Sequence, residues 1–173
     1  MDRAERLSVG VVVERRRLDN PWVEVGWRVI GALPGVPDLP AWSVLEESGA
    51  ATRFYAGTAE IALHPGEAES YKLNLDGPRP ALYVILRRDG GSGPGLRLLG
   101  VTADPGEVDA HSDAGDDLIE AVPLPAAVAL WMRDFVDRHF VERPFHKRQR
   151  DRADPEALGR RPPSPHPQEK DHG

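Results

Sequence analysis

The sequence predicts an α+β domain that is mainly β: an antiparallel barrel or sandwich of about seven strands, then one C-terminal helix and a disordered C-terminal tail. Three observations lead to this class. Short apolar segments with strand-like alternation follow one another as far as residue 122, separated by turn sequences rich in Gly, Pro, Asn and Asp. Residues 121–145 contain the one clearly helical pattern. Beyond residue 143 the chain becomes charged and rich in proline.

The first two strands are expected to form an antiparallel hairpin. Leu7–Val13 is typical of a buried strand, and the charged run Glu14–Arg17 carries its far end into solvent. Asp19–Trp22 is a turn signal, and Val23–Leu33 is the returning strand. Residues 33–40 are then a proline-rich loop, residues 41–45 a short apolar segment, and residues 46–51 a loop.

Five further strands are expected. They are Arg53–Leu63, Ala68–Leu75, Ala81–Arg88, Leu96–Ala103 and Leu118–Val122. Gly57 suits a bend or bulge within the first of them. The nearly continuous apolar character of Ala81–Arg88 indicates a central strand. Residues 104–107 are suited to start a short helical turn.

The C-terminal helix is predicted over residues 125–142. Leu124, Val128, Trp131, Phe135 and His139 recur at helical spacing and form one face. Pro125 suits the first turn, and Pro144 ends the helix. Arg133 with Asp137, and Asp134 with Arg138, are spaced for ion pairs on the opposite side. We expect Trp131 and Phe135 to be buried against the sheet.

We therefore expect a single β-rich domain over residues 1–146 and a disordered basic, proline-rich tail over residues 147–173. Residues 143–173 carry a net charge of +3, which leaves −9 on the rest, and their few large apolar side chains cannot offset the entropy of ordering the chain. Deleting residues 151–173 should thus leave the melting temperature nearly unchanged. The order of elements resembles that of pleckstrin-homology-like domains, and a generic α+β roll accounts for it equally well.

Composition excludes several classes of function. The 173 residues include 22 Lys and Arg against 28 Asp and Glu, and this net charge of −6 argues against general nucleic-acid binding. With no cysteine, disulfides, thiolate metal sites and cysteine nucleophiles are excluded, which fits a cytoplasmic protein. Neither a signal peptide nor an apolar stretch long enough to span a membrane is visible.

No catalytic, cofactor-binding or metal-binding residues emerge from the motifs. The six histidines form no HExxH pair, and no nucleotide-binding glycine fingerprint or nucleophile elbow occurs. The glycine-rich segment Gly90–Gly95 lacks the Lys-Ser/Thr of a phosphate-binding loop and is best explained as a hairpin tip. The acidic segment around His111 lacks the calcium-loop spacing and is best explained as a solvated loop; its carboxylates are Asp109, Asp113, Asp116 and Asp117.

Two basic clusters are the candidate partner-binding residues. Arg15, Arg16 and Arg17 end the first strand, and a solvated strand end is the alternative explanation. The second cluster directly follows the predicted helix and could contact an acidic surface, with a solvated tail as the alternative. It contains Lys147, Arg148 and Arg150.

Several segments together resemble an uncharacterised bacterial family. They are LSVGVVVERRRLDNPW (Leu7–Trp22), YKLNL (Tyr71–Leu75), YVILR (Tyr83–Arg87), VTADPGE (Val101–Glu107) and EAVPLPAAVALWMRDFVDRHFVERPFHKRQR (Glu120–Arg150). That family is a domain of unknown function encoded mostly beside formate dehydrogenase genes, and its members are sometimes labelled molybdopterin-guanine dinucleotide biosynthesis protein A. The label implies a nucleotide-binding α/β fold, whereas VGVVVERRR has neither the glycine pattern nor a following helix. The resemblance therefore implies a setting and supplies no catalytic residues.

The function expected from these observations is that of a non-enzymatic accessory protein. The resemblance implies formate dehydrogenase, or one of its maturation factors, as the partner. No cofactor is expected, and the oligomeric state is left open. The alternative is an enzyme or carrier for molybdopterin guanine dinucleotide or another anionic ligand, with Arg15, Arg16, Arg17 and the glycine loop as contacts.

Overall fold

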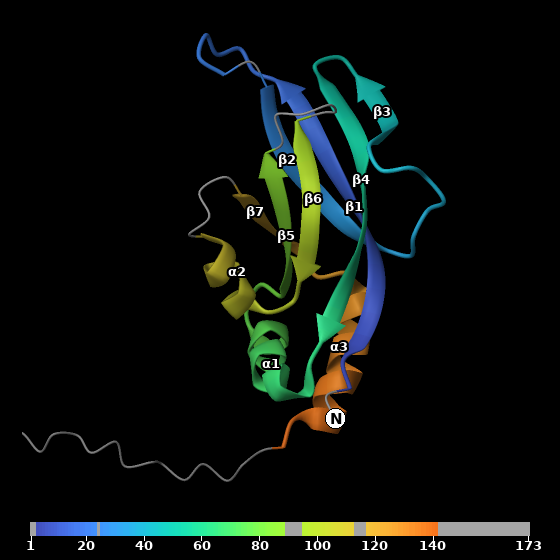
Figure 1. Ribbon diagram of the computed structural model, residues 1–173, viewed down its shortest axis with the longest axis vertical. Coiled ribbons are helices and arrows are strands. Elements are labelled where there is room, and N and C mark those ends of the chain that lie inside the picture. Colours follow the sequence, from blue (N-terminus) through green and yellow to red (C-terminus); the bar gives the residue numbers. More distant parts are fainter. Residues whose placement is uncertain (1–2, 24, 89–94, 113–116, 142–173) are drawn as a thin grey trace, which may run out of the picture. The chain divides into compact units, whose positions relative to one another are not determined.

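Two antiparallel sheets form the body of the structure, a computed structural model that describes residues 3–23, 25–88, 95–112 and 117–141 (Figure 1). The first sheet has the order β2-β1-β4-β3, and its strands are β1 (Glu5–Arg17), β2 (Val25–Pro34), β3 (Ser43–Ser48) and β4 (Ala51–Leu63). The second has the order β6-β5-β7, with β5 (Ala81–Arg88), β6 (Leu96–Thr102) and β7 (Asp117–Pro123). The helices are α1 (Ala68–Asp76), which follows the 3-10 turn η1 (Pro65–Glu67), α2 (Pro105–Ser112) and α3 (Ala126–His139). The predicted mainly β, α+β class is confirmed.

Strand β1 is the centre of the first sheet. It pairs antiparallel with β2, as the hairpin prediction required, and along its whole length with β4. The pairing with β4 is interrupted at Gly57, where Val11 lies opposite Gly57 and Val12 opposite Tyr55. Gly57 has φ +135°, which a residue with a Cβ rarely adopts, so the predicted bulge is present and depends on glycine.

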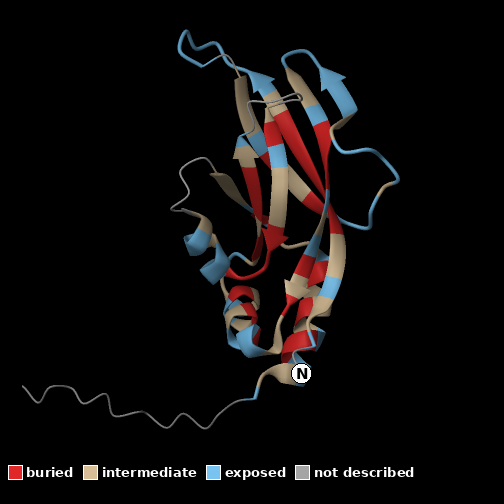
Figure 2. Cartoon of the chain, in the orientation of Figure 1, coloured by how far each residue is buried: buried red, intermediate tan, exposed pale blue. Residues whose placement is uncertain are grey.

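The hydrophobic core lies between the two sheets and continues to α1 and α3, and Figure 2 shows the buried parts of these elements. Val9, Val11 and Val13 point into it from alternate positions of β1, and β5 contributes Leu82, Val84 and Leu86. The backbone N–H of Val29 on β2 donates to Glu120 Oε2 on β7, at 2.7 Å, and so ties an edge of one sheet to the other. As predicted, β5 is the central strand of its sheet.

Residues 68–75 were predicted to be a strand, and this prediction is wrong: they lie in α1. Ala68, Tyr71 and Asn74 are the buried positions, and their spacing of three follows a helix. The side-chain amide of Asn74 donates to the carbonyls of Ala81, at 2.9 Å, and Ala103, at 3.0 Å. Its oxygen accepts from the N–H of Ala81 at 3.0 Å. Three hydrogen bonds to the backbone thus fix α1 beside the ends of β5 and β6.

Helix α3 confirms the predicted C-terminal helix, and its buried face is rotated slightly from the predicted one. Phe135 is fully buried and packs edge-on against Tyr71 of α1, with ring centres 5.9 Å apart, whereas Trp131 is only half-buried. The other buried residues of the helix are Val128, Met132 and Val136.

The ion pairs of α3 match the prediction in part. Arg138 pairs with Asp134 at 3.0 Å, as expected, and also reaches Glu5 of β1 at 2.6 Å. Arg133 pairs with Asp76 of α1 at 2.9 Å instead of with Asp137 on its own helix. Both extra contacts join α3 to neighbouring elements. The helix therefore closes on α1 and the start of β1 (Figure 1).

Two other expectations change, and a third is confirmed. Residues 46–48, expected as a loop, extend the apolar segment before them into the edge strand β3. The short helical turn after residue 104 is confirmed as α2. With α1 and α2 the fold has more than the one helix predicted. Lys147, Arg148, Arg150 and the rest of the expected tail lie outside the described residues.

Replacing Phe135 with Ala should lower the free energy of unfolding by about 3–5 kcal/mol, because a fully buried aromatic ring leaves a cavity that its neighbours cannot fill. Thermal unfolding followed by circular dichroism measures the effect. Trp131→Ala should cost less, since that ring is partly exposed, and Leu130→Ala, on the exposed side, should leave the melting curve unchanged. Equal melting temperatures for Phe135→Ala and Leu130→Ala would mean that α3 is not docked.

Candidate functional site

The last residues of β1 extend past the hydrophobic core. Their side chains continue the face of the first sheet that the core valines occupy. Arg15 and Arg17 follow Val13 at two-residue spacing, so they project from the same face as the buried valines. Arg15 lies opposite Trp27, and Arg17 lies opposite Val25, both on β2. Strands β1 and β4 have 13 residues each, against seven or eight in the second sheet. A hollow open to solvent lies here, lined by Arg15, Arg17, Leu18, Asp19, Asn20, Val25 and Ala50.

An aromatic cluster positions Arg15. Its guanidinium carbon lies 5.1 Å from the ring centre of Phe54 and 6.0 Å from that of Trp27. Trp42 completes the cluster, with its ring centre 6.0 Å from each of those two rings. Contact through the face of a guanidinium leaves the N–H groups at its edge available to carboxylates. Trp42 has φ +67°, which is unusual for a bulky residue, and its backbone N–H donates to Tyr55.

Arg16 lies on the opposite face of the sheet. It is bound there to Glu14, with 3.3 Å between Arg16 Nη2 and Glu14 Oε1, and Arg53 Nε contacts the other carboxylate oxygen at 3.2 Å. The hydrogen bond from Arg53, together with Arg16, holds the pKa of Glu14 below its usual value of 4.5. The three consecutive arginines therefore do not form one site: Arg15 and Arg17 share the hollow, and Arg16 is engaged elsewhere.

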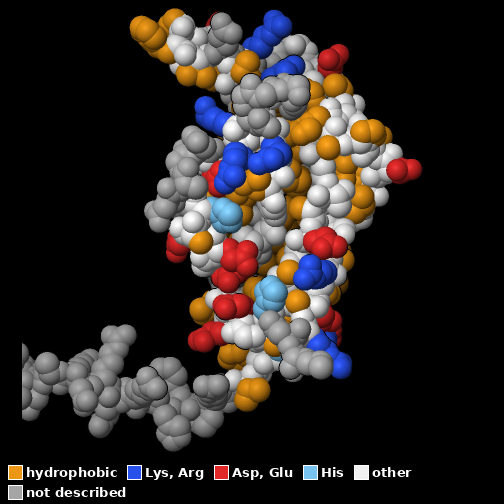
Figure 3. Space-filling view, in the orientation of Figure 1, with side chains coloured by type: hydrophobic (Ala, Val, Ile, Leu, Met, Phe, Trp, Pro, Cys, Tyr) orange, Lys and Arg blue, Asp and Glu red, His pale blue; other side chains and the backbone are white. Residues whose placement is uncertain are grey.

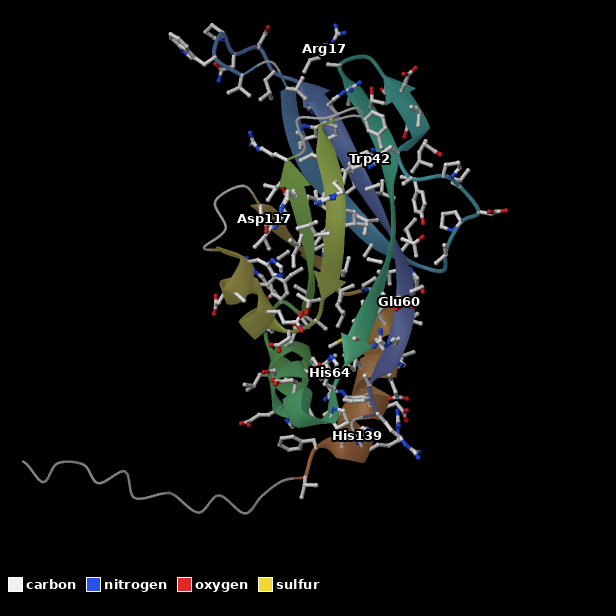
Figure 4. All side chains as sticks on the ribbon, in the orientation of Figure 1. Arg17, Trp42, Glu60, His64, Asp117 and His139 are labelled. Atoms are coloured by element: carbon white, nitrogen blue, oxygen red, sulfur yellow. The ribbon has the colours of Figure 1, made fainter. Side chains whose placement is uncertain are left out.

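The loop between β1 and β2 contains an exposed tryptophan. Trp22 is 89% exposed, and its backbone N–H donates to Asn20 Oδ1 at 2.9 Å, which fixes the turn. Leu18 and Val23 are also exposed, at 41% and 48%. Figure 3 shows hydrophobic side chains at this tip, and Figure 4 labels Arg17 at the end of β1. We call Arg15, Arg17, Leu18, Trp22 and Val23 the hairpin-tip surface.

The sequence did not single out Trp22 as a functional residue. Its segment was interpreted as a turn, which the structure confirms, but the exposure of the indole was not anticipated. One signal was available. A tryptophan directly after Asn-Pro sits within turn chemistry, before the next apolar strand begins, so no sheet face is at hand to bury it.

The acidic segment around His111 was expected to be an exposed loop, and in its described part this is wrong: Asp109 and His111 lie in α2, and Asp117 begins β7, where it forms an ion pair. The nearly inaccessible side chain of Asp117 accepts a hydrogen bond from Arg87 Nε at 2.8 Å, and His111 Nδ1 lies 3.5 Å from its other oxygen. The hydrogen bond from Arg87 keeps the pKa of Asp117 below its usual range. Asp113 and Asp116 lie outside the described residues. A carboxylate whose charge is already neutralised by a guanidinium has little affinity for a metal ion.

Comparison with protein-family models matches residues 8–149 to a family described as a protein of unknown function, DUF3305. The chain belongs to the DUF3305 family. The match spans the described fold almost completely, and it confirms the resemblance to an uncharacterised domain family. No curated protein and no solved structure matches the chain. The pleckstrin-homology-like arrangement and the formate dehydrogenase setting therefore stay predictions.

The rest of this DUF3305 domain offers fewer candidate binding or catalytic residues. Within the described ranges, no three His, Asp or Glu side chains gather closely enough to hold a metal ion, and no helix is long and apolar enough to cross a membrane. The buried Tyr71 hydroxyl accepts a hydrogen bond from the N–H of His64, and burial raises its pKa to about 12. It therefore stays protonated at neutral pH. Residues 89–94, most of the glycine loop, lie outside the described part.

Replacing Glu14 with Gln should destabilise the domain in a pH-dependent way. Because the folded-state pKa of Glu14 lies below 4.5, its stabilising effect is fully present above about pH 4.5 and is lost as the pH falls through the folded-state value. Urea unfolding of wild type and variant from pH 7 to pH 3 measures this. The difference in the free energy of unfolding should shrink on acidification. The matched control is Glu60→Gln, at a carboxylate in an exposed pair with Arg6, and a pH-independent difference for Glu14→Gln would contradict the assignment.

Proposed function

We propose that this DUF3305 protein is a non-enzymatic accessory protein that binds a partner protein in the expression or maturation of formate dehydrogenase. The hairpin-tip surface is the docking surface. One observation carries the proposal: Arg15 and Arg17 project side by side from the core face of the first sheet, and neither has an ion-pair partner among the described residues.

The chemistry of these two side chains favours an acidic partner. Arg15 is held by Phe54 and Trp27, so little side-chain entropy remains to be lost when its N–H groups bind a carboxylate. The protein as a whole carries a net charge of −6, and two neighbouring arginines without an ion-pair partner among the described residues form a local patch of positive charge on it. Such a patch attracts an oppositely charged surface and orients the encounter.

The biological setting comes from the family resemblance. The segments Leu7–Trp22 and Glu120–Arg150 resemble a family encoded mostly beside formate dehydrogenase genes, and the match over residues 8–149 supports membership of an uncharacterised family. The first of these segments contains Arg15, Arg17 and Trp22. The partner is therefore the dehydrogenase or one of its maturation factors.

A second candidate function uses the same hollow. A carrier of molybdopterin guanine dinucleotide, or of another anionic ligand, would pair its phosphates with Arg15 and Arg17. The open hollow that these residues line favours this candidate over other small-molecule functions. Calorimetry with the cofactor and with GTP separates the two candidates, because a partner-binding protein should give no heat of binding with either ligand.

Reversing the charges of Arg15 and Arg17 to Glu should weaken recovery of the partner from native cells while leaving the protein folded, with the melting temperature lowered only by the loss of the contacts of Arg15 with Phe54 and Trp27. The double substitution replaces two attractive charges by two repulsive ones, at the half-buried Arg15 and the exposed Arg17. Affinity pull-down with identification by mass spectrometry measures recovery. The control is Arg6→Glu with Arg79→Glu, which changes the net charge equally at sites away from the hairpin tip. Undiminished recovery of the dehydrogenase or a maturation factor would remove these arginines from the interface, and repeated recovery of unrelated proteins alone would refute the proposed partner.

Charge reversal at Lys147, Arg148 and Arg150 tests the second basic cluster in the same assay. If that cluster contributes to docking, the triple variant should bind less partner, and wild-type binding should fall as salt rises, since exposed charges are screened over about 10 Å at 0.1 M. Binding with unchanged affinity and salt dependence would leave this segment a solvated tail. The hairpin tip would then be the remaining docking candidate.

A further inference from the structure

We infer that Trp22 is the anchor residue of docking, and that it inserts into an apolar pocket bordered by acidic side chains on the partner protein. This inference rests on the proposed function, because it names the chemistry of the partner at the same surface. It concerns a residue that the electrostatic proposal does not need. The two ideas can therefore fail separately.

The exposure of Trp22 is the first observation. An indole can bury more apolar area than any other side chain, yet Trp22 is 89% exposed, while Trp27, Trp42 and Trp131 all pack against the core. Tryptophan and arginine are the residue types most enriched among those that dominate binding energy in interfaces. Here an exposed tryptophan and two arginines occur within residues 15–22.

The second observation is that the loop is braced. The N–H of Trp22 is bound to Asn20 Oδ1, and Pro21 fixes the backbone torsion between them. At the base of the loop, Leu18 covers Gly26 so closely that a Cβ at Gly26 would lie 3.1 Å from Leu18 Cδ1. Arg17 pairs with Val25 in the β1–β2 ladder just below. A preformed loop loses little entropy on binding, which favours its use as an anchor.

Charge decides the kind of partner. Arg15 and Arg17 line one hollow with Leu18 of the loop that carries Trp22, so the surface around the pocket that receives Trp22 should carry Asp or Glu. An anionic membrane would also attract tryptophan and arginine. However, the large apolar side chains exposed in the described part of the loop are three, Asp19 lies in the same loop, and the net charge of −6 opposes approach to anionic lipid. A protein surface fits these features better.

The test places a photo-crosslinker at the anchor. Trp22→p-benzoylphenylalanine, introduced in the full-length protein in native cells, should crosslink on irradiation to the dehydrogenase or a maturation factor. The crosslinked peptide of that protein should contain large apolar residues beside Asp or Glu. The same substitution at Leu130, which is 73% exposed on α3, is the control and should not capture that protein. Absence of a crosslink specific to position 22, or a peptide of basic composition, would overturn the inference.

Affinity for the captured protein, once purified, completes the test. Trp22→Ala should weaken binding about 30-fold or more, as expected of a dominant interface residue, with an unchanged melting curve because the side chain is exposed. Gly26→Ala, which displaces Leu18 and leaves Trp22 intact, should weaken binding less. Unchanged affinity of Trp22→Ala, while Arg15→Glu with Arg17→Glu still reduces binding, would refute the anchor and leave the proposed function standing. If neither Trp22→Ala nor the double arginine variant weakened binding, both the anchor and the proposed docking surface would be refuted.

Two other occupants of the tip have their own readouts. Vesicles of phosphatidylcholine with one quarter phosphatidylglycerol should leave the tryptophan fluorescence unchanged. A spectral shift that disappears in Trp22→Phe would assign the tip to membranes and overturn the inference. Sedimentation velocity should give the same mass for wild type and Trp22→Ala. A wild-type dimer that becomes a monomer in Trp22→Ala would assign the tip to a second copy of the chain.

Discussion

The alternation of side chains along β1 is the constraint on which the core and the candidate site both depend. A strand sends every second side chain to the same face, so Val9, Val11 and Val13 enter the core, and Arg15 and Arg17 must follow them on that face. Two charged side chains cannot be buried without partners, so the second sheet cannot continue over them. The core therefore ends where the arginines begin, and the end of the first sheet that no described strand of the second sheet covers borders the open hollow.

The same alternation explains why three adjacent arginines have different roles. Arg16 falls on the outer face with Glu14, and Arg53 of β4 shares that carboxylate. The charge of Arg16 is thus neutralised within the sheet. Arg15 is restrained by contact with aromatic rings, which fix its position, and no carboxylate in the described part of the chain pairs with it. The outer face of β1 contributes to stability, while the core face at its end is available for binding. Trp22 follows β1 in the chain, in the turn that leads to β2.

Much of the fold could be predicted from the sequence, since turn residues and the two-residue period mark most strands and the bulge at Gly57. The prediction for residues 68–75 was wrong because Tyr71, Leu73 and Leu75 alternate as in a strand. The helix instead buries Ala68, Tyr71 and Asn74, and a buried asparagine with three backbone partners does not register as a core position in an apolar pattern. In α3 the contact with α1 rotated the buried face from Trp131 toward Met132. At the site, the sequence indicated the arginines, and strand alternation was the signal that could have divided them between the two faces. Which residues of β2 and β4 lie opposite each arginine depends on the register of β1 with those strands, which the sequence did not supply.

The central claim is that docking occurs at the distal end of the β1–β2 hairpin, and hydrogen–deuterium exchange of the complex with the captured partner tests it most directly. Backbone amides of residues 15–23 in free protein exchange at a rate set by the hairpin and by the pairing of β1 with β4, and a partner seated there excludes solvent from them. We predict slower exchange on binding in this segment and no change in α1 or α3. Protection confined to α1 and α3, with residues 15–23 unchanged, would contradict the account.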